Sequence, residues 1–199
     1  MRVIMALLLA VVSLPLVAAE PVRLGLVLAG GGESVSKAAL AAMRVETEKI
    51  LDLDEIRFEW RGPEGLRPGE TFDRIVVVRF VEPEIDGVQV RGLDGPLGST
   101  QVSEGRVLPF VTLDSARVRR TVERLAIATR TPATRQDLGR ALGRVLSHEL
   151  YHVLSASQDH DSEGVAQAAL SGRELVRGEL RFTESTRERI RQGLRRALD

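Results

Sequence analysis

The feature that most constrains how this 199-residue chain can fold is the sequence His148-Glu149-Leu150-Tyr151-His152, which has the pattern H-E-x-x-H. Its two histidines are four positions apart, and residues at that spacing project from one face of an α-helix, one turn apart. Glu149 projects from the adjacent edge of the same face. The pattern therefore predicts a helix that presents two imidazoles and a carboxylate close together.

Two imidazoles on one helix face can bind a single Zn²⁺ that lies about 2.0–2.1 Å from each nitrogen. We therefore predict that His148 and His152 are zinc ligands, a role that requires neutral rings and is compatible with the usual histidine pKa. Glu149 would reach a water on the metal rather than the metal itself, and is expected to be the general base that takes its proton. The alternative is a pair of histidines that bind no metal.

A third ligand is expected, because a catalytic zinc has three protein ligands and one open position. His160 is the only other histidine of the chain, and the small residues 155–157 would let the chain turn back toward the metal. We rank His160 first, and Glu174, which lies in a helical setting further along, second. Three more carboxylates beside His160 could bind the metal or hydrogen-bond a ligand: Asp159, Asp161 and Glu163.

Residues 1–19 have the features of a cleaved export signal. The chain starts with Met1-Arg2, residues 3–17 are almost entirely apolar, and small residues end the segment at Ala19. The apolar run is short for a membrane span, which needs about 20 residues. We predict a signal peptide over 1–19, a periplasmic or extracellular location, and no stable membrane insertion after cleavage; an uncleaved anchor is the alternative.

The remaining residues, 20–199, are enough for a single domain with its own core, and their composition limits the possible partners and chemistry. The 28 basic and 28 acidic residues balance, so no overall charge favours nucleic acid as a partner. The absence of cysteine excludes disulfides, thiolate ligands and a cysteine nucleophile. The fold must therefore be stabilised by its core, and a metal could add to it.

The hydrophobic pattern is that of an α+β fold, with strands mainly before helices. Strands are expected at 22–28, 56–60 and 75–80, the last of them central in a sheet because it is apolar and β-branched. Residues 107–112 are expected to form an edge strand, because Pro109 cannot donate to a ladder. Loops are expected at 61–71 and 82–105, and helices at 36–51, 114–128, 133–155 and 184–198.

The stretch HELYHVLSASQDHDSEGVAQAAL, residues 148–170, resembles a set of bacterial exported zincin-like proteins that carry HELxHxLxxxxxHxxxGxx. The similarity extends to residues 43–60, which end in an IRFEWR-type strand, and to GSTQVSEGRVLPFV at 98–111, with shorter matches at 173–175 and 180–182.

The resemblance implies a metzincin-like fold, in which a small mixed sheet packs on helices and the H-E-x-x-H helix is central. It also implies that His148, His152 and His160 bind the zinc and that Glu149 is catalytic. Some relatives have Gly-Ile-Met after the third histidine, like the methionine turn beneath a metzincin zinc. This chain has Gly164-Val165-Ala166 there, without the methionine.

These residues together predict an exported peptidase with Zn²⁺ as cofactor and a peptide or protein as substrate. An amidase acting on cell-wall peptides would use the same chemistry. The alternative is a non-catalytic zinc-binding module of the cell envelope, in which the metal is structural and Asp159 or Asp161 is a fourth ligand. Glu149 favours the enzyme, because a structural site has no need of a general base.

Overall fold

The computed structural model describes residues 20–30, 34–62, 64–81 and 95–196, and the predicted export signal over 1–19 lies outside them. The elements in chain order are β1 (Val22–Leu28), α1 (Lys37–Ile50), β2 (Ile56–Arg61), β3 (Arg74–Val81), β4 (Gly98–Ser103), β5 (Arg106–Asp114), α2 (Ser115–Thr129), α3 (Arg135–Ser155), α4 (Gly172–Val176) and α5 (Glu184–Arg195). None of the helices in these ranges is long and apolar enough to span a lipid bilayer.

The sheet of the described chain has five strands in the order β2-β1-β3-β5-β4. The first four of these run parallel, and β4 is antiparallel to β5, so the sheet is mixed. β3 is the middle strand, which confirms the prediction made from its apolar, β-branched sequence. β4 forms one edge of the sheet.

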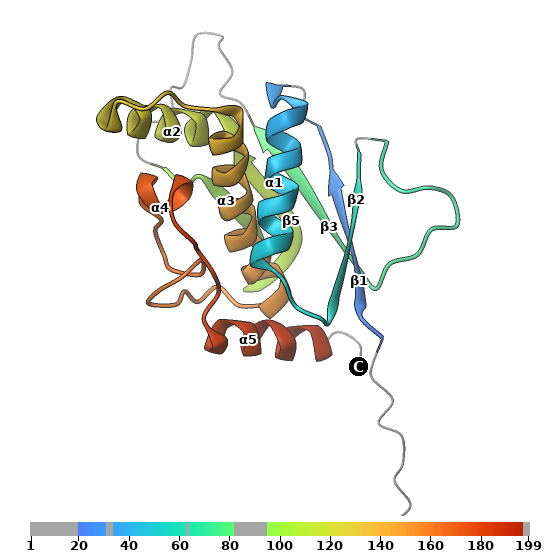
Figure 1. Ribbon diagram of the computed structural model, residues 1–199. Coiled ribbons are helices and arrows are strands. Elements are labelled where there is room, and N and C mark those ends of the chain that lie inside the picture. Colours follow the sequence, from blue (N-terminus) through green and yellow to red (C-terminus); the bar gives the residue numbers. More distant parts are fainter. Residues whose placement is uncertain (1–19, 31–33, 63, 82–94, 197–199) are drawn as a thin grey trace, which may run out of the picture.

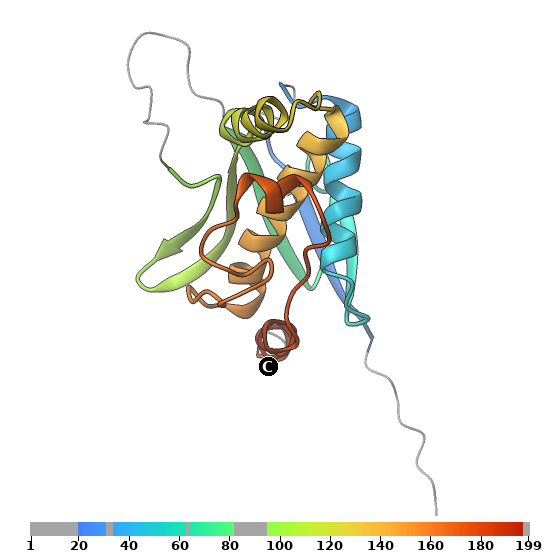
Figure 2. The same cartoon turned by 60° about the vertical axis from the view of Figure 1, so that its left-hand side comes forward.

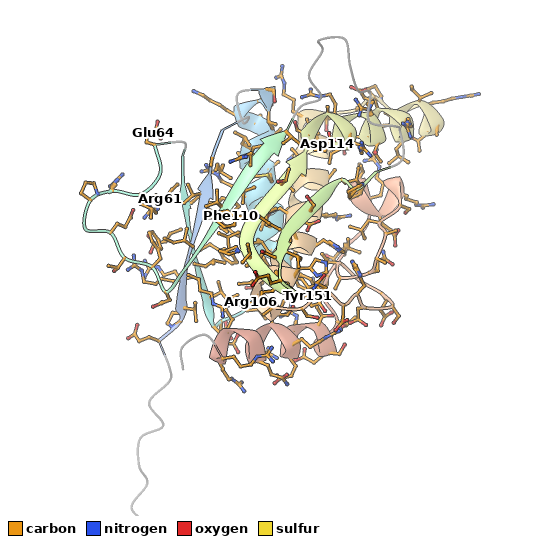
Figure 3. All side chains as sticks on the ribbon, turned by 180° about the vertical axis from the view of Figure 1, so that it is seen from behind. Arg61, Glu64, Arg106, Phe110, Asp114 and Tyr151 are labelled. Atoms are coloured by element: carbon orange, nitrogen blue, oxygen red, sulfur yellow. The ribbon has the colours of Figure 1, made fainter. Side chains whose placement is uncertain are left out.

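The helices α1 and α3 lie side by side on one face of the sheet, with α2 at one end and α5 at the other (Figures 1 and 2). Figure 3 shows the opposite face, on which Phe110 is 46% exposed. The core lies between the sheet and the helices, and its fully buried side chains include Leu24, Leu26, Val76, Val78, Leu142 and Leu146.

Helix α3 carries the H-E-x-x-H pattern and packs against α1, α2, α4, α5, β4 and β5. It begins with a capping box, in which the Thr134 hydroxyl accepts from the Asp137 N–H and the Asp137 carboxylate accepts from the Thr134 N–H. It ends at Ser155, and Ala156 follows in the left-handed conformation with φ of 52°. Helix α3 is therefore fixed on nearly every side, which makes it a rigid support for its histidines.

Two glycines of α3 allow it to approach α1 closely. A Cβ on Gly139 would overlap the carbonyl oxygen of Ala39, and a Cβ on Gly143 would lie 2.8 Å from the carbonyl oxygen of Met43. Side chains at these positions would force the helices apart, because packed cores tolerate little added volume. The two glycines therefore permit the close packing of α3 on α1.

The structure corrects two expectations about the sheet. Residues 98–103, expected in a loop, form β4, and β5 is an inner strand rather than an edge. Pro109 is tolerated there because β3 pairs with β5 only from Phe110 onward, while the β4–β5 register shifts between Thr100 and Val102. No regular ladder bond therefore needs the N–H that proline lacks. The rest of the expected loop, 82–94, lies outside the described residues.

The four expected helices are present, with ends within a few residues of those expected. The last three residues of the chain, where the final helix was expected to end, lie outside the described residues. Glu174 was expected in a helical setting and lies in α4, but no bounds were expected for this helix, because five residues are too few to show a helical period.

Candidate metal centre

The structure brings three histidine side chains together near the end of α3. His148 and His152 come from α3, and His160 comes from the segment that follows it. One ring nitrogen of each histidine lies within 4.8 Å of the other two, and the Nε2 atoms of His148 and His152 are 3.2 Å apart. His152 is buried, His148 half-buried and His160 exposed, so the cluster is open to solvent on the His160 side.

Backbone carbonyl groups orient two of the three rings. The Nδ1 of His148 donates to the carbonyl oxygen of Val165, and the Nδ1 of His152 donates to that of Ser157, both at 2.9 Å. Because a carbonyl oxygen can only accept, the proton of each neutral ring is on Nδ1. The Nε2 lone pairs of both rings are therefore free for a metal ion.

The cluster fits a zinc ion in geometry and in protonation. Two nitrogens bound to one tetrahedral zinc at about 2.0–2.1 Å lie about 3.3 Å apart, close to the 3.2 Å between the two Nε2 atoms. Burial is the main cause that lowers the pKa of His148 to about 4; the bond to Val165 acts in the opposite direction, and His152 and His160 contribute to the lowering. Burial also lowers the pKa of His152. Both rings are therefore neutral at pH 7, which is the form that binds a metal.

Glu149 is 6% exposed, and its carboxylate accepts a 2.7 Å hydrogen bond from the Thr100 hydroxyl of β4. Burial raises the pKa of Glu149 to about 7, and the Thr100 bond acts in the opposite direction. Among the described residues, no cationic side chain contributes to this shift. A buried carboxylate without a counter-ion is a group that a nearby metal cation would stabilise.

Gly98 allows β4 to approach Glu149. A Cβ at this position would lie 2.7 Å from Val145 Cγ1 and 2.9 Å from Glu149 Oε1, so a side chain would displace the carboxylate. Gly98 and Thr100 were both missed as site residues, because their segment was expected to be a loop. The signal that could have found them is the dipeptide Glu104-Gly105, a candidate two-residue turn of a β-hairpin. In the structure both residues have positive φ, as such a turn requires.

A cavity of about 260 Å³ opens beside His148 and Glu149. Its other lining residues are small or apolar with one exception, an amide: Gly95, Pro96, Leu97, Gly98, Val145, Gln167, Ala168, Ala169 and Leu170. The cavity therefore lies between the segment that leads into β4 and the segment that leads into α4. A group bound in it would be adjacent to both a candidate ligand and the candidate base.

Three of the four rival carboxylates are hydrogen-bonded elsewhere, and the fourth, Glu163, is exposed. The carboxylate of Glu174 accepts from the backbone and hydroxyl of Ser171, where it caps α4, and from the Gln167 amide. The carboxylate of Asp159 accepts from the Ser157 hydroxyl, and Asp161 is bonded to the start of α5. Within the described ranges, the three histidines are the one group found that could hold a metal ion. Their role as ligands, and that of Glu149 as base, stay predictions.

The segment that stands where relatives have a methionine turn supports the cluster through its backbone. Val165 and Ala166 are fully buried, and the Val165 carbonyl oxygen holds His148. Tyr151, the tyrosine inside the H-E-x-x-H pattern, is also fully buried, with its ring centroid 6.2 Å from that of Phe182. It lies close to α5 (Figure 3) and faces the core.

The fold and the histidine cluster define an α+β protein in which a mixed sheet packs on helices and three histidines form a candidate metal centre. The chain is similar to the crystal structure of archaemetzincin from Methanopyrus kandleri, with a TM-score of 0.52 over 88% of this chain and 96% of that one. The two sequences are 15% identical, so the likeness concerns the fold alone. No protein-family model matches the chain, and no curated protein matches it in sequence.

Proposed function

We propose that the protein is an exported zinc-dependent peptidase, with His148, His152 and His160 as zinc ligands and Glu149 as the general base. One observation carries the proposal: three histidine nitrogens converge, and among the described residues no fourth ligand joins them. A structural zinc is normally enclosed by four protein ligands, whereas a catalytic zinc has three and an open position. The likeness to archaemetzincin supports a metzincin-like fold, and the sequence of residues 1–19 supports export.

In the proposed reaction, Glu149 is the group that moves a proton. A zinc ion held by the three histidines would supply Lewis acidity and lower the pKa of a water molecule. The Glu149 carboxylate would accept the proton of that water and then deliver it to the leaving amine of the cleaved peptide. The Thr100 hydroxyl, which donates to this carboxylate, would hold it in one orientation during both steps.

An extended peptide is the substrate that fits the surroundings of the site best. β4 pairs with β5 on one side and has no strand partner on the other within the described residues. Such an edge can accept a peptide main chain as an additional strand. Because Thr100 of β4 contacts Glu149, a peptide along β4 would pass close to the base. The adjacent cavity of about 260 Å³ would receive one of its side chains.

The second candidate function is a non-catalytic module with a structural zinc. It would need a fourth ligand, and the two residues considered for this role, Asp159 and Asp161, are hydrogen-bonded to Ser157 and to the start of α5. A structural zinc would also give no role to Glu149, whose buried side chain lies beside the cluster. These observations favour the peptidase.

Zinc content and peptide hydrolysis, measured on the same purified chain, test the proposal. We expect about one zinc per chain, because one zinc takes three histidine ligands, and hydrolysis of a library of unstructured peptides. A chelator should stop the hydrolysis, and added Zn²⁺ should restore it. Bound zinc without hydrolysis of any peptide would favour the structural module, and a chain that binds no zinc would exclude both functions.

Gly98→Ala is expected to lower peptide hydrolysis and to destabilise the fold by about 1–3 kcal/mol, because the added methyl group overlaps Val145 and the Glu149 carboxylate. The free energy of unfolding and the rate of hydrolysis are the measurements. Gly172→Ala is the matched control, because its methyl group would lie 3.4 Å from the nearest side-chain atom, on Thr121. Equal effects of the two substitutions would show that β4 does not need its close approach to Glu149.

A further inference from the structure

All three histidines depend on one segment, residues 157–167, which we call the ligand loop. It contains His160, and it provides the two carbonyl oxygens, of Ser157 and Val165, that orient His152 and His148. The position of the ligand loop therefore decides whether the three rings converge.

The ligand loop has few backbone–backbone hydrogen bonds of its own, and its internal side-chain bonds join close neighbours in sequence. The Asp161 N–H donates to the Ala166 carbonyl at 2.9 Å, and the Gln167 N–H donates to the Gly164 carbonyl at 3.4 Å. The loop contains no helix and no strand longer than an isolated bridge. A segment of this kind takes its position from its contacts with the rest of the fold. The buried Val165 and Ala166 anchor one end of the loop, and the Val165 N–H donates to the Arg181 carbonyl.

Within the described residues, the largest group of side-chain hydrogen bonds from the loop to the rest of the fold is that of Asp161, the residue directly after His160. Its Oδ2 accepts hydrogen bonds from Thr186 Oγ1 at 2.6 Å, Arg189 Nη2 at 2.7 Å and Thr183 Oγ1 at 2.8 Å. Ser185 Oγ lies 3.1 Å from the same oxygen. We call these five residues the Asp161 clasp. All four donor groups converge on the same oxygen of the Asp161 carboxylate.

The clasp joins the ligand loop to a fixed part of the fold. Thr183 is the N-cap of α5, and a carboxylate at a helix N-terminus is favoured by the helix dipole. Helix α5 is anchored through the buried Ile190 and Leu194, and a Cβ on its Gly193 would overlap the carbonyl oxygen of Leu154 in α3. Helix α5 packs on α3, and Asp161 is bonded to the start of α5. His160, which directly precedes Asp161, is therefore connected to α3 through α5.

We propose that Asp161 is a positioning residue for the metal centre, whose clasp to the start of α5 holds His160 where it converges with His148 and His152. The inference rests on the proposed function in taking His160 as a zinc ligand. Asp161 acts through His160 rather than on the metal, because its carboxylate is occupied by hydroxyl and guanidinium donors that a cation would have to displace.

Asp161→Asn tests the proposal, with Asp159→Asn as the matched control on the other side of His160. Among the described residues, the hydrogen bond that the Asp159 carboxylate accepts comes from the Ser157 hydroxyl, within the same loop. Thr186→Val is a second variant that removes one donor of the clasp and preserves the side-chain shape. Three quantities are measured on the full chain: the affinity for Zn²⁺ alone, by competition with a chromogenic chelator; the visible spectrum with Co²⁺; and backbone hydrogen exchange in excess chelator.

We expect Asp161→Asn to lower the zinc affinity by about 10–100-fold, as the loss of a group that orients a ligand does. Its Co²⁺ spectrum should change, and hydrogen exchange should accelerate over 157–167 but not over 135–150. Thr186→Val should show a smaller loss in the same direction. Asp159→Asn should stay within about twofold of the wild type, as most surface substitutions do.

Unchanged zinc affinity in Asp161→Asn, or an equal loss in Asp159→Asn, would overturn the positioning role. Faster exchange throughout the chain would overturn it as well, because it would show a general loss of stability. If Asp161→Asn fails to fold, the same three measurements on Thr186→Val test the positioning role, and an unchanged zinc affinity in that variant would overturn it. A wild type that binds zinc but hydrolyses no peptide would contradict the peptidase and leave this inference standing, whereas a wild type that binds no zinc would contradict both.

Discussion

Glu149→Gln is expected to lower the turnover of peptide substrates by about 10²–10⁴-fold, the usual contribution of a general base, and to leave the zinc content unchanged. Glutamine has the shape of glutamate and can still accept the Thr100 hydrogen bond, but it cannot take a proton from water. Zinc should remain bound because Glu149 is outside the group of convergent histidines. Initial rates and zinc analysis of the same sample check both parts.

Glu163→Gln is the control for this substitution, since Glu163 undergoes the same chemical change on an exposed part of the ligand loop. It should retain wild-type zinc content and turnover. The folded state should tolerate Glu149→Gln well, because a neutral amide costs less to bury than a carboxylate whose pKa burial has raised to about 7. A Glu149→Gln variant that keeps full turnover would exclude Glu149 as the base, and one that loses its zinc would make it a ligand.

His160→Ala is expected to weaken zinc binding by more than about 100-fold, since losing a group that merely orients a ligand already costs about 10–100-fold. Peptide hydrolysis should be lost at the same zinc concentrations. The fold should remain intact in the absence of metal, because His160 is exposed and contributes little to the core. Zinc titration and thermal unfolding in the presence of chelator are the measurements.

Glu174→Gln separates the two ranked candidates for the third ligand. The Glu174 carboxylate caps α4 and bonds Gln167, so its loss should lower stability by about 0.5–2 kcal/mol, as the loss of a capping interaction does, without changing the zinc affinity. If Glu174→Gln weakened zinc binding and His160→Ala did not, the third ligand would be Glu174, and α4 would have to rearrange around the metal.

The elements that could be predicted are those whose signal lies within a few neighbouring residues. Helix α3 has a capping box, a buried stripe and two histidines at helical spacing, all within residues 134–155, and β3 has a continuous apolar run. Strand β4 was missed because its sequence is polar, its residues are mostly exposed, and glycines recur through the segment 82–105 that contains it. It becomes a strand only by pairing with β5. The edge strand expected from Pro109 was wrong for the same reason, because the irregular pairing that tolerates this proline depends on both neighbouring strands.

The sequence by itself determined the helix, the spacing of His148 and His152 on it, and the position of Glu149 beside them, because a helix fixes the directions of nearby side chains. Tertiary structure alone decided what surrounds them. Thr100 reaches Glu149 across 49 residues of chain, and Asp161 joins the loop of His160 to α5. Contacts between residues this far apart in sequence follow from how the layers pack, and no local period in the sequence encodes them.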